Sequence, residues 1–469
     1  MLDLFLAAFV LGWLAIGLRR PFLWVLVYLY VDIVAPQKIS YFLLASLPIS
    51  LIAFLAAAVG WMLTDDKRDS RFTVRQGLIL VLLAYCGMTT LSADFLNEAA
   101  DKWSWVWKAL VFASFLPLTL RTRLRFEAVA LTLVLSAGSI IITGGIKTVF
   151  SGGGYGSLHF FVNDNTGLYE GSIISCVAIA IIPLIWWLVN HGTIYPKSLI
   201  VKLFGVALTF ACLLIPVGTQ ARTGLLCIAL LFLLSLRSVK KRFLYVGSMV
   251  ALALIAVPFL PASYTKRMDT IGNHQADESA STRVAVWMWT LGYVQDHPFG
   301  GGFEAYRANR LKIEMRDAQT SGNTTDVELK ETVDKGRAYH SSYFEMLGEQ
   351  GWPGLVLWLT IQVMGLWQME RLRRRWKRKA SAEGAGPDVQ WQAPLANALQ
   401  QAQLIYLLGG AFLGIAYQPF ILMLIGMQCG LWSYLRRIDS PAPRGVRVKP
   451  VMTIPDAVPD VVPDAVAAS

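Results

Sequence analysis

Apolar runs close to the bilayer-spanning length of about 20 residues recur along most of this chain, and no other feature restricts its fold as strongly. The runs do not alternate apolar and polar residues as the strands of a membrane barrel do. We therefore predict an all-α, polytopic membrane protein with about 12–13 transmembrane helices. The runs lie at roughly 2–18, 21–36, 40–63, 75–92, 104–120, 126–147, 168–190, 198–217, 223–236, 243–261, 354–370, 401–417 and 419–435.

The links between the runs carry most of the basic residues of a chain whose formal net charge is +11. If the spans alternate, seven basic links fall on one side, which the positive-inside rule makes the cytoplasm. The first run has no small-residue cleavage site, so we expect a first span rather than a signal peptide. This pattern explains the charge through membrane topology and gives no support for nucleic-acid binding. The seven links contain Arg19 and Arg20, residues 65–75, residues 121–125, Lys197 and Lys202, residues 237–242, residues 371–379, and Arg436 and Arg437.

Four regions follow from this pattern. Residues 1–261 are predicted to form an N-terminal transmembrane bundle, and 262–353 a periplasmic loop with short helices. Residues 354–437 would add C-terminal spans joined by a basic cytoplasmic linker at 371–399 that contacts membrane lipids. The tail at 438–469 has no core pattern and is predicted to be disordered.

The long loop contains one clear helical pattern at 282–296, followed by a glycine-rich turn. We predict a second helix from Phe303 to about Arg316, then a mobile polar stretch at 318–336. Ser342 and Glu345 have the spacing of a capping box, which predicts a short helix lying along the membrane surface. Gly351 and Pro353 are expected to end that helix.

His340 and Arg222 are the strongest candidates for chemistry on the periplasmic side. His340 precedes the predicted cap, where an imidazole can transfer protons, although a surface histidine would give the same pattern. Arg222 opens a span, and a guanidinium there can bind phosphate in a bidentate way. Contact with lipid headgroups is the ordinary alternative for Arg222, but an arginine on this side runs against the positive-inside bias.

Weaker candidates for substrate binding are Arg283, Lys147, Asp164 and Asn165. Arg283 begins the 282–296 helix, where a solvated charge is the simpler explanation. Lys147 ends a span beside a glycine run that could approach an anion. Asp164 can cap the following span or contact sugar hydroxyls, and Asn165 stands next to it. The acidic residues and histidines have no metal-ligand spacing and the five cysteines lie in apolar runs, so we predict no metal, no disulfide framework and no cofactor.

Several short motifs give the chain a resemblance to the O-antigen ligase and polymerase superfamily, over most of residues 1–437. Within it, the sequence is similar to the O-glycosylation ligases associated with exosortase systems. The motifs are Thr219-Gln-Ala-Arg-Thr-Gly, Ser281-Thr-Arg-Val-Ala-Val-Trp, Pro298-Phe-Gly-Gly-Gly-Phe, His340-Ser-Ser-Tyr-Phe-Glu, Gly351-Trp-Pro-Gly-Leu and Asn163-Asp-Asn-Thr.

The resemblance implies a GT-C-like helical fold and a metal-independent, inverting glycosyltransferase of the bacterial inner membrane. It implies catalytic roles for Arg222 and His340 and a supporting role for Arg283. The donor would be an undecaprenyl-pyrophosphate-linked glycan, and the acceptor a hydroxyl of a protein, a lipid or a glycan. The alternatives are a polysaccharide polymerase and, from another class, a lipid-linked glycan flippase, which should carry ionisable groups deep in several spans.

Overall fold

A computed structural model describes residues 2–40, 42–65, 67, 72–150, 167–237, 239, 241–256, 278–321, 324–384 and 386–439. Helices dominate this part of the chain. The α-helices of the first half are α1 (Leu2–Gly17), α2 (Phe22–Val34), α3 (Pro36–Ile39), α4 (Ile49–Thr64), α5 (Val74–Leu91), α6 (Leu96–Thr119), α7 (Arg123–Phe150), α8 (Gly171–His191), α9 (Leu199–Gly218) and α10 (Arg222–Ser235). The second half adds α11 (Arg242–Ala256), α13 (Glu278–Asp296), α14 (Ser342–Ala380), α15 (Gln392–Gly410) and α16 (Pro419–Asp439).

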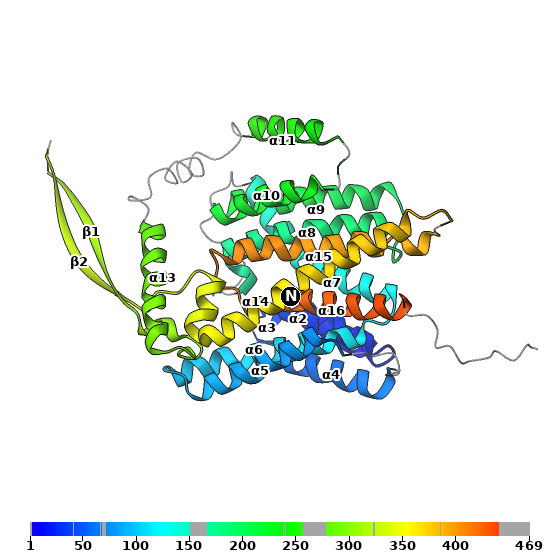
Figure 1. Ribbon diagram of the computed structural model, residues 1–469, viewed down its shortest axis with the longest axis horizontal. Helices are drawn as coiled ribbons and strands as arrows, with labels where there is room; N and C mark the ends of the chain where they lie inside the picture. The colour runs from blue at the N-terminus through cyan, green and yellow to red at the C-terminus, as the bar shows by residue number, and fades with distance from the viewer. Residues whose placement is uncertain are drawn as a thin grey trace, which may run out of the picture.

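Most of the long helices lie side by side and form a bundle, while α13 stands across one end of it (Figure 1). In the described part of the chain, α5, α7, α8 and α9 are long and apolar enough to cross a membrane. Four shorter helices, α1, α2, α4 and α10, are also apolar. Helix α8 is the most enclosed of the four long spans and packs against α7, α9, α10 and α15. The predicted multi-pass helical class is confirmed.

Arg75 departs from its expected place in an exposed basic link. Its side chain is fully buried. Nε donates to the carbonyl of Ile361 at 2.9 Å, and Nη1 donates to Gln428 Oε1 at 2.7 Å. A Cβ on Gly365 would lie 2.1 Å from the guanidinium, so only glycine leaves room for it. Arg75 therefore joins α5 to α14 and α16 instead of facing the cytoplasm.

The predicted helix from Phe303 to Arg316 and the mobile stretch at 318–336 are both wrong. After the 3-10 turn η4 (Ala305–Ala308), the chain forms the antiparallel strands β1 (Arg310–Ser321) and β2 (Thr324–Lys335). This hairpin projects beyond α13, away from the bundle (Figure 1). The sequence does carry a signal for it, because Leu311, Ile313 and Met315 alternate with polar residues ahead of a Gly-Asn pair.

Helix α14 also differs from its prediction. Gly351 breaks it with φ 64°, ψ −167°, but the helix resumes and continues to Ala380. The first segment is not a surface helix, because Met346 and Leu347 are buried in the protein. The basic stretch from Arg371 therefore begins as helix rather than linker. Helix α15 likewise begins at Gln392, nine residues before the predicted span.

We expect Gly351→Ala to lower the apparent thermal unfolding midpoint of the detergent-solubilised protein. A side chain in this backbone region, which glycine alone adopts readily, costs roughly 1–3 kcal/mol, and a Cβ would lie 2.2 Å from the carbonyl oxygen of Pro298. Gly292→Ala is the matched control. Gly292 lies in α13, and nothing stands within 4 Å of the position that a Cβ would take there, so alanine should be neutral or stabilising by up to about 1 kcal/mol. Equal midpoints for both variants would contradict this account of the break.

Candidate active site

At the Gly351 break, backbone groups of α14 lose hydrogen bonds within the helix and form hydrogen bonds with the glycine loop at 300–302 and the residues before it. The amide of Trp352 donates to Pro298 at 3.0 Å rather than to the carbonyl four residues back, which is that of Gly348. The freed carbonyls of Gly348 and Glu349 accept from Gly301 at 3.1 Å and Gly302 at 2.9 Å. The two glycine motifs of the sequence therefore pack together as one backbone junction.

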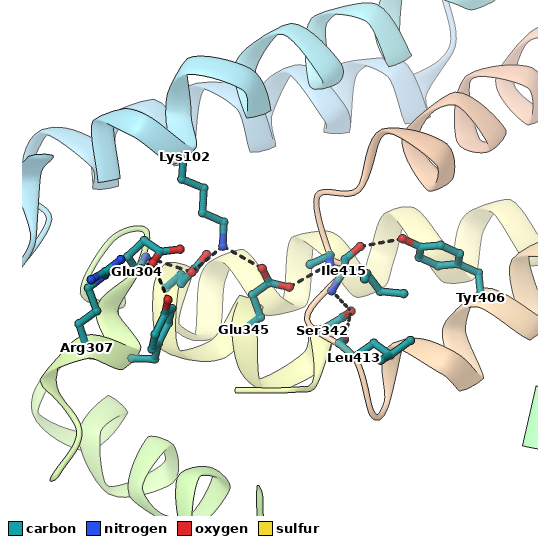
Figure 2. Close-up of polar contacts among 11 residues, drawn as sticks. Lys102, Glu304, Arg307, Ser342, Glu345, Tyr406, Leu413 and Ile415 are labelled. Carbon is teal, nitrogen blue, oxygen red and sulfur yellow. Dashed lines mark hydrogen bonds and ion pairs between the residues drawn. The ribbon is translucent and has the colours of Figure 1, made fainter. Parts of the chain in front are cut away.

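This junction places Glu304 next to the buried face of α14. Its amide donates to Glu349 Oε1 at 3.1 Å. Its own carboxylate accepts from the Tyr306 hydroxyl at 2.6 Å and from Arg307 Nε at 3.2 Å. Figure 2 shows Glu304 and Arg307 side by side next to α14, whose Glu345 lies below Lys102.

Lys102 reaches from α6 to two carboxylates one turn apart on α14. Its Nζ lies 2.8 Å from Glu345 Oε1 and 2.7 Å from Glu349 Oε1. The three side chains are nearly buried, with exposed fractions of 12%, 8% and 0%. Acids at i and i+4 share one helix face, which is why a single ammonium group can pair with both. We call Lys102, Glu345 and Glu349 the Lys102 ion pair cluster.

The predicted capping box is wrong. The N-cap residue is Ser341, which makes no side-chain cap hydrogen bond. Ser342 Oγ instead donates to the carbonyl of Leu413 at 2.8 Å and accepts from Ile415 at 3.0 Å. Glu345 Oε2 accepts from the amide of Ala416 at 2.9 Å. The two residues thus fasten the loop between α15 and α16 to the start of α14 (Figure 2).

A cavity of about 650 Å³ opens beside the cluster. It is lined by segments from α2, α3, α6, the start of α8, the 304–307 turn, α14 and the 411–418 loop. Among the described residues, seven carboxylates face three permanent cations in its lining. The acids are Asp32, Glu98, Asp101, Glu170, Glu304, Glu345 and Glu349, and the cations are Lys38, Lys102 and Arg307. The lining is therefore rich in carboxyl groups, but burial raises the pKa of Glu349 to about 8, so this group does not carry a full negative charge at neutral pH.

His340 lies in the cavity lining, directly before α14. Its backbone has φ 45°, a left-handed conformation that few residues other than glycine adopt. Trp287 of α13 holds this turn. Its Nε1 donates to the carbonyl of Tyr339 at 2.9 Å, and its ring stacks on Phe344 with centroids 5.0 Å apart.

The pKa of His340 is lowered from the ordinary value of 6.5, by partial desolvation first and then by Arg283 and Arg337. The side chain of His340 remains accessible to solvent, but the protein around it removes part of the water near the ring. Arg283 lies four residues before Trp287 on α13, so the two share the helix face toward His340. Arg283 also affects Glu170. Burial raises the pKa of Glu170, and the charge of Arg283 offsets part of that increase. The structure thus brings two of the predicted residues, His340 and Arg283, into one electrostatic environment.

Arg222 and Lys147 lie at the same end of the bundle but are not among the residues that line the cavity. The turn before Arg222 is tied to α8 by a 2.8 Å hydrogen bond between Thr219 and Ser175. On the other side of this turn, a Cβ on Gly218 would lie 2.0 Å from Thr148 Oγ1, so the end of α7 packs closely there. Lys147 is the neighbour of Thr148. The predicted residues Asp164 and Asn165 lie outside the described residues.

The sequence reasoning missed the Lys102 ion pair cluster. A signal for it exists in the chain, because Glu345 and Glu349 stand at i and i+4 among apolar residues of a short helix. Such carboxylates need a cation if that face is buried. Their partner Lys102 lies 243 residues from Glu345 and 247 residues from Glu349 in the chain, so no local pattern points to it. Within the described ranges, no three His, Cys, Asp or Glu side chains are grouped to hold a metal ion.

Two family models match the chain. Residues 1–193 match a family of unknown function, DUF5935. Residues 204–359 match the O-Antigen ligase family. No curated protein matches the chain.

The match to the O-antigen ligase family implies a glycosyltransferase-type enzyme, a ligase or polymerase of lipid-linked glycans. The matched segment contains Arg222, Arg283, His340 and both acids of the Lys102 ion pair cluster. Lys102 itself lies in the DUF5935 segment. The candidate site therefore combines residues from both matched segments, and the Lys102 ion pairs connect them.

We expect Lys102→Met to lower the apparent unfolding midpoint strongly. Removing one partner leaves two buried carboxylates without their cation, a change that typically costs about 3–5 kcal/mol. Adding Glu349→Gln to this variant should recover part of the loss. Arg374→Met is the control, because Arg374 pairs with Glu370 at a position 69% exposed, where such a pair contributes about 0–1 kcal/mol. A midpoint for Lys102→Met equal to that of the control would show that the cluster does not hold these segments together.

Arg337→Gln should raise the pKa of His340 toward 6.5, because it removes one of the two cations that disfavour the imidazolium. His340 would then keep its proton to a higher pH. Arg283→Gln should give a larger increase, since Arg283 has the larger effect. Histidine-labelled NMR titration at low salt measures both, with His191 at the far end of α8 as an internal control. A downward shift in either variant would contradict the assignment.

Proposed function

We propose that this protein transfers a glycan from undecaprenyl pyrophosphate to an acceptor hydroxyl, with His340 as the general base. The observation that carries the proposal is the position of His340 in the cavity lining, where partial desolvation and Arg283 favour its neutral form. A neutral imidazole can accept a proton at neutral pH. The family match supports the same class of chemistry.

In the proposed reaction, His340 takes the proton from the acceptor hydroxyl. The acceptor oxygen attacks the anomeric carbon of the glycan from the face opposite the leaving group. The bond from that carbon to the pyrophosphate oxygen breaks, and its electron pair leaves with the pyrophosphate. Configuration is inverted because one displacement takes place.

Arg222 and Arg283 would stabilise the charge that grows on the departing pyrophosphate, with Lys147 as a third cation. Both guanidinium groups can contact two phosphate oxygens at once. Pyrophosphate is a good leaving group once its charge is neutralised in this way. We therefore propose that transfer needs no divalent metal ion.

We place this chemistry at the periplasmic face of the inner membrane. The seven basic links support this orientation, since they put the cavity end of the bundle opposite the cytoplasm. Labelling of a cysteine introduced at Arg337 from outside intact spheroplasts reports the side directly. A polymerase would run the same steps with a growing glycan as acceptor. The likeness to exosortase-associated ligases stays a prediction from the sequence motifs.

His340→Ala and Arg222→Lys should separate the two roles. His340→Ala should lower turnover by about 10²–10⁴-fold, the usual contribution of a general base, while donor affinity stays unchanged. Arg222→Lys keeps the charge but loses the planar fork, so donor affinity should fall. The measurements are in vitro transfer from a polyprenyl-pyrophosphate glycan, with and without chelator, and donor binding by a separate assay.

His191→Ala and Arg374→Lys are the matched controls, because both residues lie away from the cavity. Chelator should leave wild-type transfer intact. Wild-type turnover in His340→Ala across the pH range would remove His340 from catalysis. Loss of transfer in chelator that only a divalent ion restores would overturn the metal-independent mechanism.

A further inference from the structure

Helices α14 and α16 carry the same short motif, a tryptophan followed four residues later by an arginine. Trp367 precedes Arg371 on α14, and Trp432 precedes Arg436 on α16. The two indole rings pack together with centroids 5.9 Å apart. Each arginine lies over the ring of its own helix, 5.3 Å from the Trp367 centroid and 5.5 Å from that of Trp432. Helix packing therefore places two guanidinium groups beside one pair of tryptophans.

This motif lies where one exposed face of α14 changes from apolar to basic. Helix α14 starts beside the cavity and runs along the bundle to its far end (Figure 1). Val356, Val363 and Trp367 share one face at helical spacing and are 59%, 62% and 54% exposed. Arg371 and Arg374 continue the same face and are also exposed. An apolar stripe that ends at a tryptophan and continues as arginine is typical of a helix that passes from the hydrocarbon layer to the headgroup layer.

Arg371 has no carboxylate partner within the ranges that the structure describes. The neighbouring acid, Glu370, is paired with other cations, namely Arg237 at 3.0 Å, Arg373 at 2.8 Å and Arg374 at 2.5 Å. Three cations around one carboxylate leave this surface positive, so Glu370 does not repel an anion from Arg371. The N–H donors of Arg371 are available to a phosphate, which can accept two of them at once.

The occupant that fits this surface is both anionic and apolar. Acyl chains can lie along the exposed valines of α14, while a phosphate reaches the arginines beyond the tryptophans. A soluble phosphate would use only the basic part of the face. A zwitterionic lipid carries an ammonium group of its own, which the arginines repel. An anionic phospholipid has the apolar part and the net negative charge together.

We propose that the Trp367–Arg371 and Trp432–Arg436 pairs form a binding site for the headgroup phosphate of one anionic phospholipid. The sequence predicts lipid contact along the whole basic stretch at 371–399, whereas the packing concentrates it at one face of α14 and the end of α16. A lipid bound there links the ends of these two helices. The site takes no part in glycan transfer, so its test does not depend on the proposed function.

Lipid titration of the delipidated, full-length protein in a neutral detergent tests the site. Native mass spectrometry gives the affinity of the first bound lipid, and thermal unfolding gives the stabilisation that it confers. Phosphatidylglycerol should bind roughly tenfold more tightly than phosphatidylcholine. Arg371→Gln should weaken phosphatidylglycerol binding by roughly fivefold, and Trp367→Leu by roughly twofold to fivefold, because the arginine loses its ring. Without lipid, Arg371→Gln should unfold at the wild-type temperature.

Lys377→Gln is the matched control. Lys377 is exposed on the same helix, but it lies about 120° around the helix axis from Arg371. This variant should bind phosphatidylglycerol as the wild type does. An equal loss of affinity in Lys377→Gln would show that only the overall positive charge attracts the lipid, and the site would be wrong. A lower unfolding temperature of lipid-free Arg371→Gln would also overturn the site, because the guanidinium would then be held within the protein.

Glycerol 3-phosphate and polyglutamate serve as probes for the other possible occupants. Neither should displace phosphatidylglycerol or stabilise the protein as the lipid does, because neither covers the apolar part of the face. Equal stabilisation by glycerol 3-phosphate would assign the arginines to a soluble anion, and displacement of the lipid by polyglutamate would assign them to an acidic protein segment. Equal affinity for phosphatidylcholine would remove the requirement for net negative charge. Each of these three results would overturn the proposal.

Discussion

The exchange of backbone hydrogen bonds at Gly351 is the constraint on which the rest of the site depends. A helix that ran unbroken through this position would satisfy its own carbonyls and leave the glycine loop without partners. Because Gly351 breaks the ladder, Gly301 and Gly302 take over the carbonyls of Gly348 and Glu349. This contact places Glu304 against Glu349 and defines one wall of the cavity.

The Lys102 ion pair cluster extends this junction into the bundle. Lys102 comes from α6, Glu345 and Glu349 come from α14, and Glu345 continues to the loop before α16. Each carboxylate is buried and costs desolvation energy, which the ammonium group and the backbone amides offset. The same two residues belong to the lining of the cavity that holds His340.

Charge is therefore divided between two places at this end of the molecule. The carboxyl-rich cavity holds His340 at its lining, while Arg283 acts on His340 from α13 and Arg222 opens α10 outside the lining. The buried Arg75 lies elsewhere and bonds to α14 and α16, so it supports packing and gives no reason to prefer a flippase.

The sequence alone determined the helical membrane class and the helix at 282–296, and it proposed a short list of site residues that contains His340, Arg222 and Arg283. These depend on local patterns, since apolar periodicity and motif spacing are set by neighbouring residues. The sequence prediction fails at 303–336, where a period-two alternation forms a hairpin in place of the expected helix and mobile stretch. It also fails at Ser342 and Glu345, whose capping-box spacing is satisfied by a different partner, the 411–418 loop.

Only the tertiary structure decided the partners of buried polar groups. Lys102 and Glu345 are 243 residues apart in the chain, and Ser342 and Leu413 are 71 residues apart. No local pattern encodes such pairings, because they arise when helices from distant segments bury their polar faces against each other. Burial removes water as the alternative partner, so each buried carboxylate and hydroxyl needs a hydrogen-bond partner in the protein or in a bound ligand. The chain's local chemistry selected the residues, and the packing of its helices determined what each one does.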